Sequence, residues 1–214
     1  MEKIGILGTG NVGAAIGKRL LHAGYSVVFG SRKEPSESVK TLVSIYSDCC
    51  ATTTIAAAAG NATLIILAAP WNAVRQVIDA AGSLKGKTLV DCTNPLTERF
   101  DGLTLGFDTS AAEQIATWAE GAHVVKAFNT VSVATMENPD YDGQKATLFY
   151  CGDDPAAMKD VERLIHAVGL EPIAAGPLIN ARYLEPLAML YIYLAVHQRM
   201  GGNTALKMMS RCAK

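Results

Sequence analysis

The sequence predicts a doubly wound α/β protein with one mostly parallel sheet, followed by a small helical lobe at the C-terminus. Short apolar runs typical of strands alternate with amphipathic helical patterns along most of the 214 residues. One of these runs, residues 63–69, is almost wholly apolar, which is typical of a central parallel strand covered on both faces. A chain of this length corresponds to one or two domains, at roughly 150 residues per domain.

The expected elements begin with a strand over residues 3–7, a helix over 11–23 that ends at a glycine, and a second strand over 25–29. Ser110 and Glu113 have the spacing of a capping box, which predicts a helix from there to residue 119. The other expected elements are the strands 63–69, 88–92, 123–128, 146–151 and 170–174 and the helices 72–81 and 155–168.

An apolar helical pattern follows the last expected strand, from about residue 180 to residue 200. We therefore expect a sheet-containing domain over residues 1–178 and a small helical lobe over residues 179–214. Pro186 falls inside the helical pattern, where it either begins a new helix or kinks one.

The composition excludes several classes of protein. Half of the residues are apolar and 18% are charged, which indicates a compact globular chain rather than a disordered one. The formal net charge is -1, so no overall positive charge is available to hold nucleic acid or an anionic membrane. The most apolar late stretch, residues 187–196, is too short to span a bilayer. No signal peptide is recognised before the first strand, and we expect a cytoplasmic protein.

The cysteines indicate neither a disulfide framework nor a metal site. Their number is odd, two are adjacent, and no Cys-x-x-Cys or Cys/His ligand spacing is present. We expect all of them to behave as small apolar side chains in a reducing compartment. They are Cys49, Cys50, Cys92, Cys151 and Cys212.

A glycine motif between the first strand and the first helix indicates a dinucleotide site. In a Rossmann-type fold, Gly8 permits the tight turn, Gly10 lets the backbone approach a pyrophosphate, and Gly13 lets the helix pack close to the strand. The free N–H groups at the helix N-terminus add a partial positive charge facing the phosphates. The whole motif is Gly8-Thr9-Gly10-Asn11-Val12-Gly13.

The end of the second strand favours NADP over NAD. An NAD site usually carries Asp or Glu there, whereas this chain has Gly30 followed by Ser31, Arg32 and Lys33. A hydroxyl and a guanidinium supply donors and positive charge for a 2′-phosphate. A hydrogen bond to a charged group contributes roughly 1.5–3 kcal/mol, which makes a preference for NADP of about 10- to 150-fold plausible. The alternative is a solvated Arg-Lys pair on a loop.

Three further loops are expected at the carboxyl ends of the strands, where ligands bind in open α/β sheets. The first contributes Ala69 and Pro70, against which the nicotinamide ribose would lie, and Trp71, which would wall the ring or serve as a packing aromatic. The second contributes Asn94, and the third contributes Ala127, Asn129 and Thr130. Each Asn would bond the cofactor or satisfy its own turn, and the turn explanation is the stronger one for Asn94.

The sequence contains no nucleophile with an adjacent base, and we assign no catalytic side chain. None of the four histidines lies in a carboxyl-end loop. Lys126 would stabilise charge on an accepting ring, but a surface lysine is the favoured interpretation. Hydride transfer between two stacked cofactors depends on positioning and exclusion of water, and it proceeds without a protein acid or base.

Together these motifs resemble the NADPH-dependent F420 reductase family (F420:NADP oxidoreductase-like proteins) over nearly the whole chain. The segments that carry the resemblance are Gly8 to Gly13, Gly30-Ser31-Arg32, Ala69-Pro70-Trp71, Asn94-Pro95-Leu96, Val125 to Thr130, Cys151-Gly152-Asp153-Asp154, Ala175-Gly176-Pro177-Leu178 and Leu184-Glu185.

The resemblance implies a Rossmann domain with a small C-terminal lobe, NADP over the glycine motif, and Ser31 and Arg32 on its 2′-phosphate. It further implies that the nicotinamide faces a deazaflavin or flavin ring near Asn94, Asn129 and Leu178, and that the protein is a homodimer.

One segment departs from the F420-using members, which have a His-Thr pair where this chain has Asn129-Thr130. That segment is more similar to the cytosolic reductase domain of the six-transmembrane metalloreductases, which pairs NADPH with a flavin. The acceptor is therefore F420, FMN, FAD or another small molecule. Two other functions stay open: an NADPH-dependent reductase of an imine or carbonyl compound, and a non-catalytic NADP-binding or sensing protein.

Overall fold

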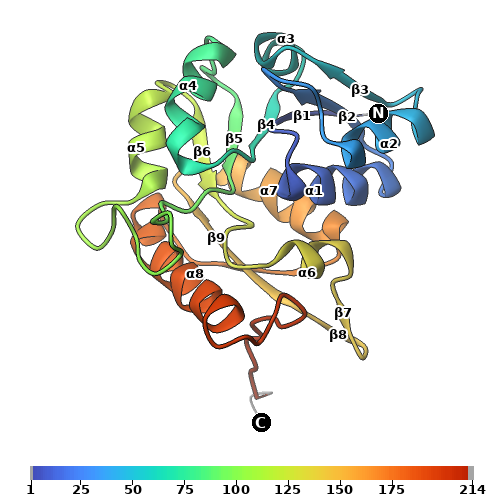
Figure 1. Ribbon diagram of the computed structural model, residues 1–214. Coiled ribbons are helices and arrows are strands. Elements are labelled where there is room, and N and C mark those ends of the chain that lie inside the picture. The colour runs from blue at the N-terminus through green and yellow to red at the C-terminus, as the bar shows by residue number, and fades with distance from the viewer. Residues whose placement is uncertain (1, 212–214) are drawn as a thin grey trace.

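The computed structural model describes residues 2–211, so Cys212 and the end of the expected C-terminal lobe lie outside the described residues. Its centre is an eight-stranded sheet in the order β10-β9-β6-β5-β4-β1-β2-β3 (Figure 1). The strands of this sheet are, in chain order, β1 (Lys3–Leu7), β2 (Ser26–Gly30), β3 (Cys50–Thr53), β4 (Leu64–Leu67), β5 (Thr88–Asp91), β6 (His123–Lys126), β9 (Thr147–Gly152) and β10 (Glu171–Ala174).

The sheet is parallel from β3 to β6, and β9 pairs antiparallel with β6 while β10 pairs parallel with β9. The prediction of a mostly parallel, doubly wound sheet is therefore confirmed. The strand order reverses at β1, which lies between β2 and β4. In folds of this kind the ligand crevice opens at the carboxyl ends of the strands beside this reversal.

Helices cover both faces of the sheet, α1 and α7 on one face and α3, α4 and α5 on the other (Figure 1). The helices are α1 (Asn11–His22), α2 (Glu37–Ile45), α3 (Ile55–Gly60), α4 (Trp71–Ala81), α5 (Ala111–Trp118), α6 (Val133–Glu137), α7 (Pro155–Val168) and α8 (Ala181–Val196), with a single 3₁₀ turn, η1 (Leu178–Asn180).

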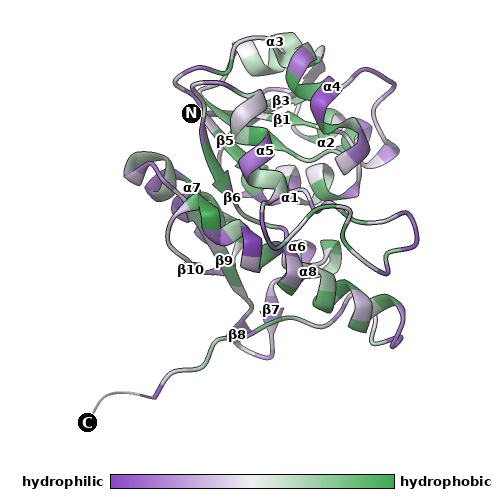
Figure 2. Ribbon diagram, turned by 90° about the vertical axis from the view of Figure 1, so that its left-hand side faces the viewer, coloured by the Kyte–Doolittle hydropathy of each residue, from purple (hydrophilic) through white to green (hydrophobic). Residues whose placement is uncertain are grey.

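Strand periodicity explains why both faces are apolar. In β4, Leu64 and Ile66 pack into the cluster under α1 and α7, whereas Ile65 and Leu67 pack into the cluster under α3, α4 and α5. The central strands are accordingly coloured as hydrophobic over most of their length (Figure 2). Successive side chains of one strand thus pack into two separate cores on the two faces of the sheet.

Several elements differ from the expected ones. Residues 34–62 hold α2, β3 and α3, for which the sequence analysis named no element. A short hairpin of β7 (Asp140–Tyr141) and β8 (Gln144–Lys145) turns through Asp142 and Gly143, both at left-handed φ. Asp142 and Gly143 form an Asp-Gly pair, which is a strong hairpin signal in a sequence.

The C-terminal helix is shorter than expected. It ends at Val196 rather than near residue 200, because Arg199 and Gly201 have left-handed φ angles of 59° and 75° that a right-handed helix does not contain. Pro186 lies inside this one helix and does not begin a new one. Among residues 2–211, no helix has the length and hydrophobicity needed to cross a membrane. The division at residue 178 stays a prediction.

Candidate active site

A groove of about 460 Å³ lies at the carboxyl ends of β1, β2 and β4, beside the reversal of strand order. It brings together most of the residues predicted to hold the nucleotide, and also residues of α3 and α4 that the sequence analysis did not name. The predicted residues that line it are Gly8, Thr9, Gly10, Ser31, Arg32, Lys33, Ala69 and Pro70. The additional lining residues are Gly30, Glu34, Ser36, Ile55, Ala68, Ala73 and Val77.

The three motif glycines perform three different tasks. Gly8 has a φ of 132°, which residues with a side chain rarely adopt. A Cβ there would lie 2.1 Å from the carbonyl oxygen of Ala68, so only glycine at this position allows the loops after β1 and β4 to approach each other. A Cβ on Gly13 would lie 2.4 Å from the carbonyl oxygen of Gly8. Because glycine has no Cβ, α1 can pack this close to the end of β1. Around Gly10 nothing lies within 4 Å of an added Cβ. The space in front of α1 is therefore open.

The N-terminus of α1 faces this open space. Gly10 is its N-cap residue and provides no side-chain cap, and the first turn contains no acidic residue. Its N–H groups are therefore available to an anion, and the helix dipole adds partial positive charge. An open cradle in front of uncapped N–H groups fits the pyrophosphate of a dinucleotide.

Polar and cationic side chains gather at the end of β2. The Ser31 hydroxyl accepts hydrogen bonds from the backbone N–H of Lys33 at 3.2 Å and from the Thr9 hydroxyl at 3.4 Å. The Arg32 guanidinium donates to Gln76 Oε1 on α4 at 2.6 Å. With Lys33, two cations thus line this end of the groove, where a 2′-phosphate would require them. Glu34 also lines it and pairs with Lys40 at 3.7 Å.

A second cavity of about 390 Å³ adjoins the groove, and the two share Pro70. It contains the predicted residues Trp71 and Asn94. The Trp71 ring stacks on Trp118 with centroids 5.5 Å apart. Its other lining residues belong to the start of α4 and to the loop after β5, namely Asn72, Leu96, Thr97, Glu98, Phe100 and Thr104.

Asn94 and Asn129 hold each other across the ends of β5 and β6. Asn94 Nδ2 donates to the carbonyl oxygen of Asn129 at 2.9 Å, and Asn129 Nδ2 donates to Asn94 Oδ1 at 3.1 Å and to the carbonyl oxygen of Leu184 at 3.1 Å. Three buried polar atoms at these strand ends have no protein partner: Thr93 Oγ1, Asn129 Oδ1 and Thr130 Oγ1. Unpaired buried acceptors and hydroxyls are costly unless a ligand or water pairs with them, which fits a polar cofactor group at this point.

The remaining predicted residues are not among those that line either cavity, namely Asn11, Val12, Gly13, Ala127, Asn129 and Leu178. Ala127 is fully buried in the core beneath Asn129, and Leu178 is buried in the core on the opposite face. Asn11 and Val12 lie in the first turn of α1, next to the groove.

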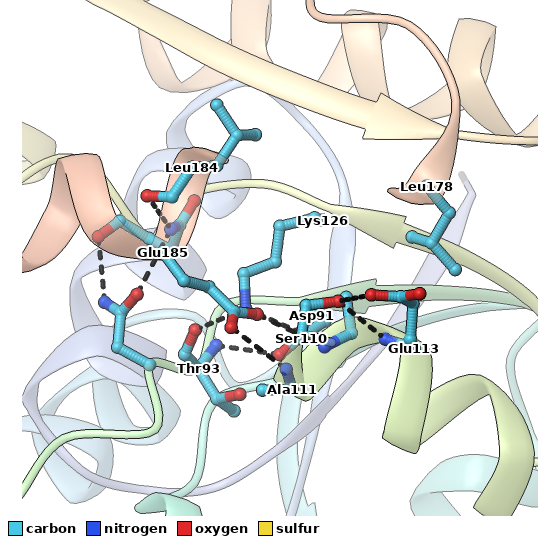
Figure 3. Close-up of polar contacts among 12 residues, drawn as sticks. Asp91, Thr93, Ser110, Ala111, Glu113, Lys126, Leu178, Leu184 and Glu185 are labelled. Carbon is cyan, nitrogen blue, oxygen red and sulfur yellow. Dashed lines mark hydrogen bonds and ion pairs between the residues drawn. The ribbon is translucent and has the colours of Figure 1, made fainter. Parts of the chain in front are cut away.

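The expectation that Lys126 is a surface lysine is wrong. Its side chain is fully buried, and its ammonium donates to Asp91 Oδ2 at 2.8 Å, to Glu185 Oε1 at 2.8 Å and to the carbonyl oxygen of Thr93 at 2.6 Å (Figure 3). Burial by itself lowers the pKa of Lys126, but the two carboxylates outweigh it and raise the pKa. The ammonium is therefore charged, and it is committed to these partners rather than to a ligand.

Glu185 extends this network to two helices. Its carboxylate accepts hydrogen bonds from the backbone N–H groups of Ala111 at 2.9 Å and Ala112 at 3.2 Å, at the N-terminus of α5 (Figure 3). Burial raises the pKa of this carboxyl. Nearby, Arg182 donates to both oxygens of Glu113 at 2.9 and 2.7 Å, and this contact lowers the Glu113 pKa. Polar contacts thus tie α8 to α5 and to the sheet directly behind Asn94 and Asn129.

Within the described part of the chain, no group of three or more His, Cys, Asp or Glu side chains is arranged to hold a metal ion. Asp91 and Glu185 face Lys126 instead.

Comparisons with known proteins agree with this geometry. Residues 3–95 match the family model described as NADP oxidoreductase coenzyme F420-dependent. The chain is 32% identical to the F420-dependent NADP reductase of Methanothermobacter marburgensis, over 92% of this chain and 94% of that protein. It is also 32% identical to the metalloreductase STEAP3 of Rattus norvegicus, but there 87% of this chain spans only 36% of the relative's length.

A solved structure shows the same fold over almost the whole chain. It is that of a candidate F420-dependent NADP reductase from Arthrobacter sp. FB24, with a TM-score of 0.87 and 28% identity, covering 98% of this chain and 100% of that one. The glycine groove, the basic residues beside it and these similarities place the chain in the family of F420-dependent NADP oxidoreductases.

Proposed function

We propose that this protein transfers a hydride between NADPH and the ring of a deazaflavin or flavin, with both rings placed where the two cavities meet. The observation that carries the proposal is their shared wall: the groove with the phosphate-binding features and the aromatic-lined second cavity meet at Pro70. A nucleotide bound along the groove would present its nicotinamide end to the second cavity. The relatives named F420-dependent NADP reductases support a deazaflavin ring. The flavin alternative rests on the similarity of the Asn129-Thr130 segment to the reductase domain of the metalloreductases.

The roles of the residues follow from their positions. The N–H groups of α1 hold the pyrophosphate above Gly10, and Ser31, Arg32 and Lys33 hold the 2′-phosphate. Asn129 lies behind the second cavity and positions Asn94, which lines it, through two hydrogen bonds. When bound, NADPH supplies a hydride to the acceptor ring, which takes up its proton from water. The protein contributes placement and exclusion of solvent, and no side-chain acid or base is required.

The expected homodimer belongs to the same proposal. Several apolar side chains of α8 are exposed, among them Tyr183, Leu190 and Val196, and a second copy of the chain would cover them. This remains a prediction from the family resemblance.

Arg32→Ala tests the nucleotide half of the proposal. The substitution is expected to weaken NADPH binding by about 10- to 150-fold, because it removes a charge-assisted hydrogen bond worth roughly 1.5–3 kcal/mol. NADH binding should change little, since NADH has no 2′-phosphate. Fluorescence titration of both nucleotides against both proteins measures the ratio.

Arg163→Ala provides the matched control, because Arg163 is an exposed arginine on α7 that pairs with Asp160 outside both cavities. It should leave both affinities unchanged. Equal losses of NADPH and NADH binding in Arg32→Ala would contradict the 2′-phosphate role.

A further inference from the structure

We propose that Gln76 on α4 is a positioning residue that strengthens the preference for NADPH over NADH by holding Arg32 across the nucleotide groove. The inference rests on the proposed function, in which Arg32 binds the 2′-phosphate, and it adds a residue that sets the strength of that contact. Gln76 does not line the groove itself. It acts through the Arg32 guanidinium, which donates a hydrogen bond to Gln76 Oε1 at 2.6 Å.

The contact between Arg32 and Gln76 joins the two sides of the groove. Arg32 follows β2, and Gln76 belongs to α4, the helix that follows β4. In the sheet β1 lies between β2 and β4, so the two strands are about 10 Å apart, which is two strand spacings. The Arg32 guanidinium is therefore drawn towards α4, across the carboxyl end of β1, rather than left extended into solvent.

The helix that carries Gln76 is well anchored and forms part of the groove wall. Val77 and Ile78, the next two residues of α4, are buried in the core beneath the helix. Val77 also lines the groove, as does Ala73, one turn before Gln76. The acceptor for Arg32 is therefore held at the rim of the groove.

The hydrogen bond to Gln76 leaves most of the Arg32 guanidinium free. Arginine carries five N–H donors in one plane, and Gln76 Oε1 accepts from Nη1 alone. The edge formed by Nε and Nη2 stays available for two parallel hydrogen bonds to a phosphate. Because the group is planar, fixing Nη1 also limits the directions in which that edge can face.

Gln76 orients Arg32 without neutralising it. A carboxylate at this position would pair with the guanidinium and repel an approaching phosphate, whereas a carboxamide is uncharged. The carboxylates on the two neighbouring segments are paired with other cations: that of Glu34 at 3.7 Å, and that of Asp79 on α4 at 2.9 Å. The positive charge of Arg32 is thus kept for the nucleotide.

The expected effect is the cost of ordering one long side chain on binding. Without Gln76, Arg32 is an exposed arginine on a loop, and the nucleotide alone must fix its rotamers. Immobilising a side chain of this kind corresponds to about two- to twelve-fold in affinity. Lys33 supplies a second cation to the groove, so the loss of NADPH binding should be partial.

Gln76→Leu tests the inference, because leucine is close to glutamine in helix propensity but cannot accept the hydrogen bond. NADPH affinity, measured by fluorescence titration, is expected to fall by about two- to twelve-fold, and NADH affinity should stay unchanged. Gln76→Glu should lower NADPH affinity further, since a carboxylate neutralises Arg32 and repels the 2′-phosphate. Gln144→Leu, the same substitution at an exposed position on β8 outside both cavities, should change neither affinity.

A double-mutant cycle with Arg32→Ala distinguishes positioning from a direct contact or a change in α4. Gln76→Leu should have no further effect on NADPH binding once residue 32 is alanine. The inference would be overturned by a loss that persists in that background, by equal losses for NADPH and NADH, or by unchanged NADPH binding in Gln76→Leu.

The same titrations separate this inference from the proposed function. If Arg32→Ala selectively weakens NADPH binding and Gln76→Leu does not, the 2′-phosphate role stands and the inference fails. Selective losses in both variants, with no hydride transfer from NADPH to F420 or FMN by the wild type, would reject the proposed reaction and support the role of Gln76. Unchanged NADPH affinity in Arg32→Ala would overturn the 2′-phosphate role and this inference together.

Discussion

Replacing Lys126 with methionine is expected to destabilise the protein by about 3–5 kcal/mol, because it leaves Asp91 and Glu185 buried without the ammonium between them. Both carboxyl groups are fully buried in the folded chain. The loss comes from uncompensated negative charge more than from the absence of an attractive contact. Urea unfolding of the purified variant measures it as a lower midpoint at an unchanged slope.

Lys18→Met is the matched control, since Lys18 is an exposed lysine on α1 and the substitution is the same. It should change the free energy of unfolding by less than about 0.5 kcal/mol. A loss in Lys126→Met no larger than in this control would contradict the buried charge network.

The difference in unfolding free energy between wild type and Lys126→Met should decrease at high pH. The folded-state pKa of Lys126 is raised above its ordinary value of 10.5, so folding favours the protonated amine. The contribution of Lys126 is therefore fully present below pH 10.5 and is lost as the pH rises through the folded-state pKa. The stabilities of wild type and Lys126→Met should converge at strongly alkaline pH.

The buried network of Lys126, Asp91 and Glu185 adjoins the loops that carry Asn94 and Asn129. Lys126 holds the carbonyl oxygen of Thr93, and the next residue is Asn94 of the second cavity. Asn129 bonds the carbonyl oxygen of Leu184, the residue before Glu185 on α8. The loops after β5 and β6 and the helix α8 thus share one set of polar contacts, and that set fixes the wall of the second cavity that contains Asn94.

How far the sequence predicted the fold depends on the length of each pattern. The strands β1, β4 and β5 and the helices α1, α4 and α7 carry apolar residues at a clear period, and the structure contains each of them. The edge strand β3 has four residues, two of them exposed, and therefore carries no apolar alternation. It is positioned by parallel pairing with β2, a contact between segments distant in the sequence.

The same distinction applies to the site. The glycine motif is a local geometry of one turn and one helix, so its residues could be identified from their spacing alone. The carboxylate partners of Lys126 lie 35 and 59 residues away along the chain, and no local spacing pattern in the sequence predicts such pairs. The available signal was compositional: Lys126 and Glu185 each stand as a lone charge inside an apolar run, which is where a buried ion pair is found.

Gly8→Ala is expected to lower stability by about 3 kcal/mol or more, even without nucleotide. Its φ of 132° is strained for any residue with a side chain, and the new methyl group would meet the carbonyl oxygen of Ala68 at 2.1 Å. Since that neighbour is backbone at the end of β4, relief requires the two loops of the groove to move apart. Thermal unfolding without ligand measures this loss.

Gly10→Ala, two residues further on, should separate binding from folding. Its φ of -81° suits alanine and no atom lies within 4 Å of the added Cβ, so stability should fall by no more than about 1 kcal/mol, the cost of a poorer N-cap. The methyl group would nevertheless occupy the open space in front of α1, and NADPH affinity should fall at least about ten-fold, which corresponds to 1.4 kcal/mol. Unimpaired NADPH binding by a folded Gly10→Ala variant would mean that the pyrophosphate does not pass over this residue. Because the two substitutions add the same methyl group to the same turn, the difference between them measures what the nucleotide requires apart from what the fold requires.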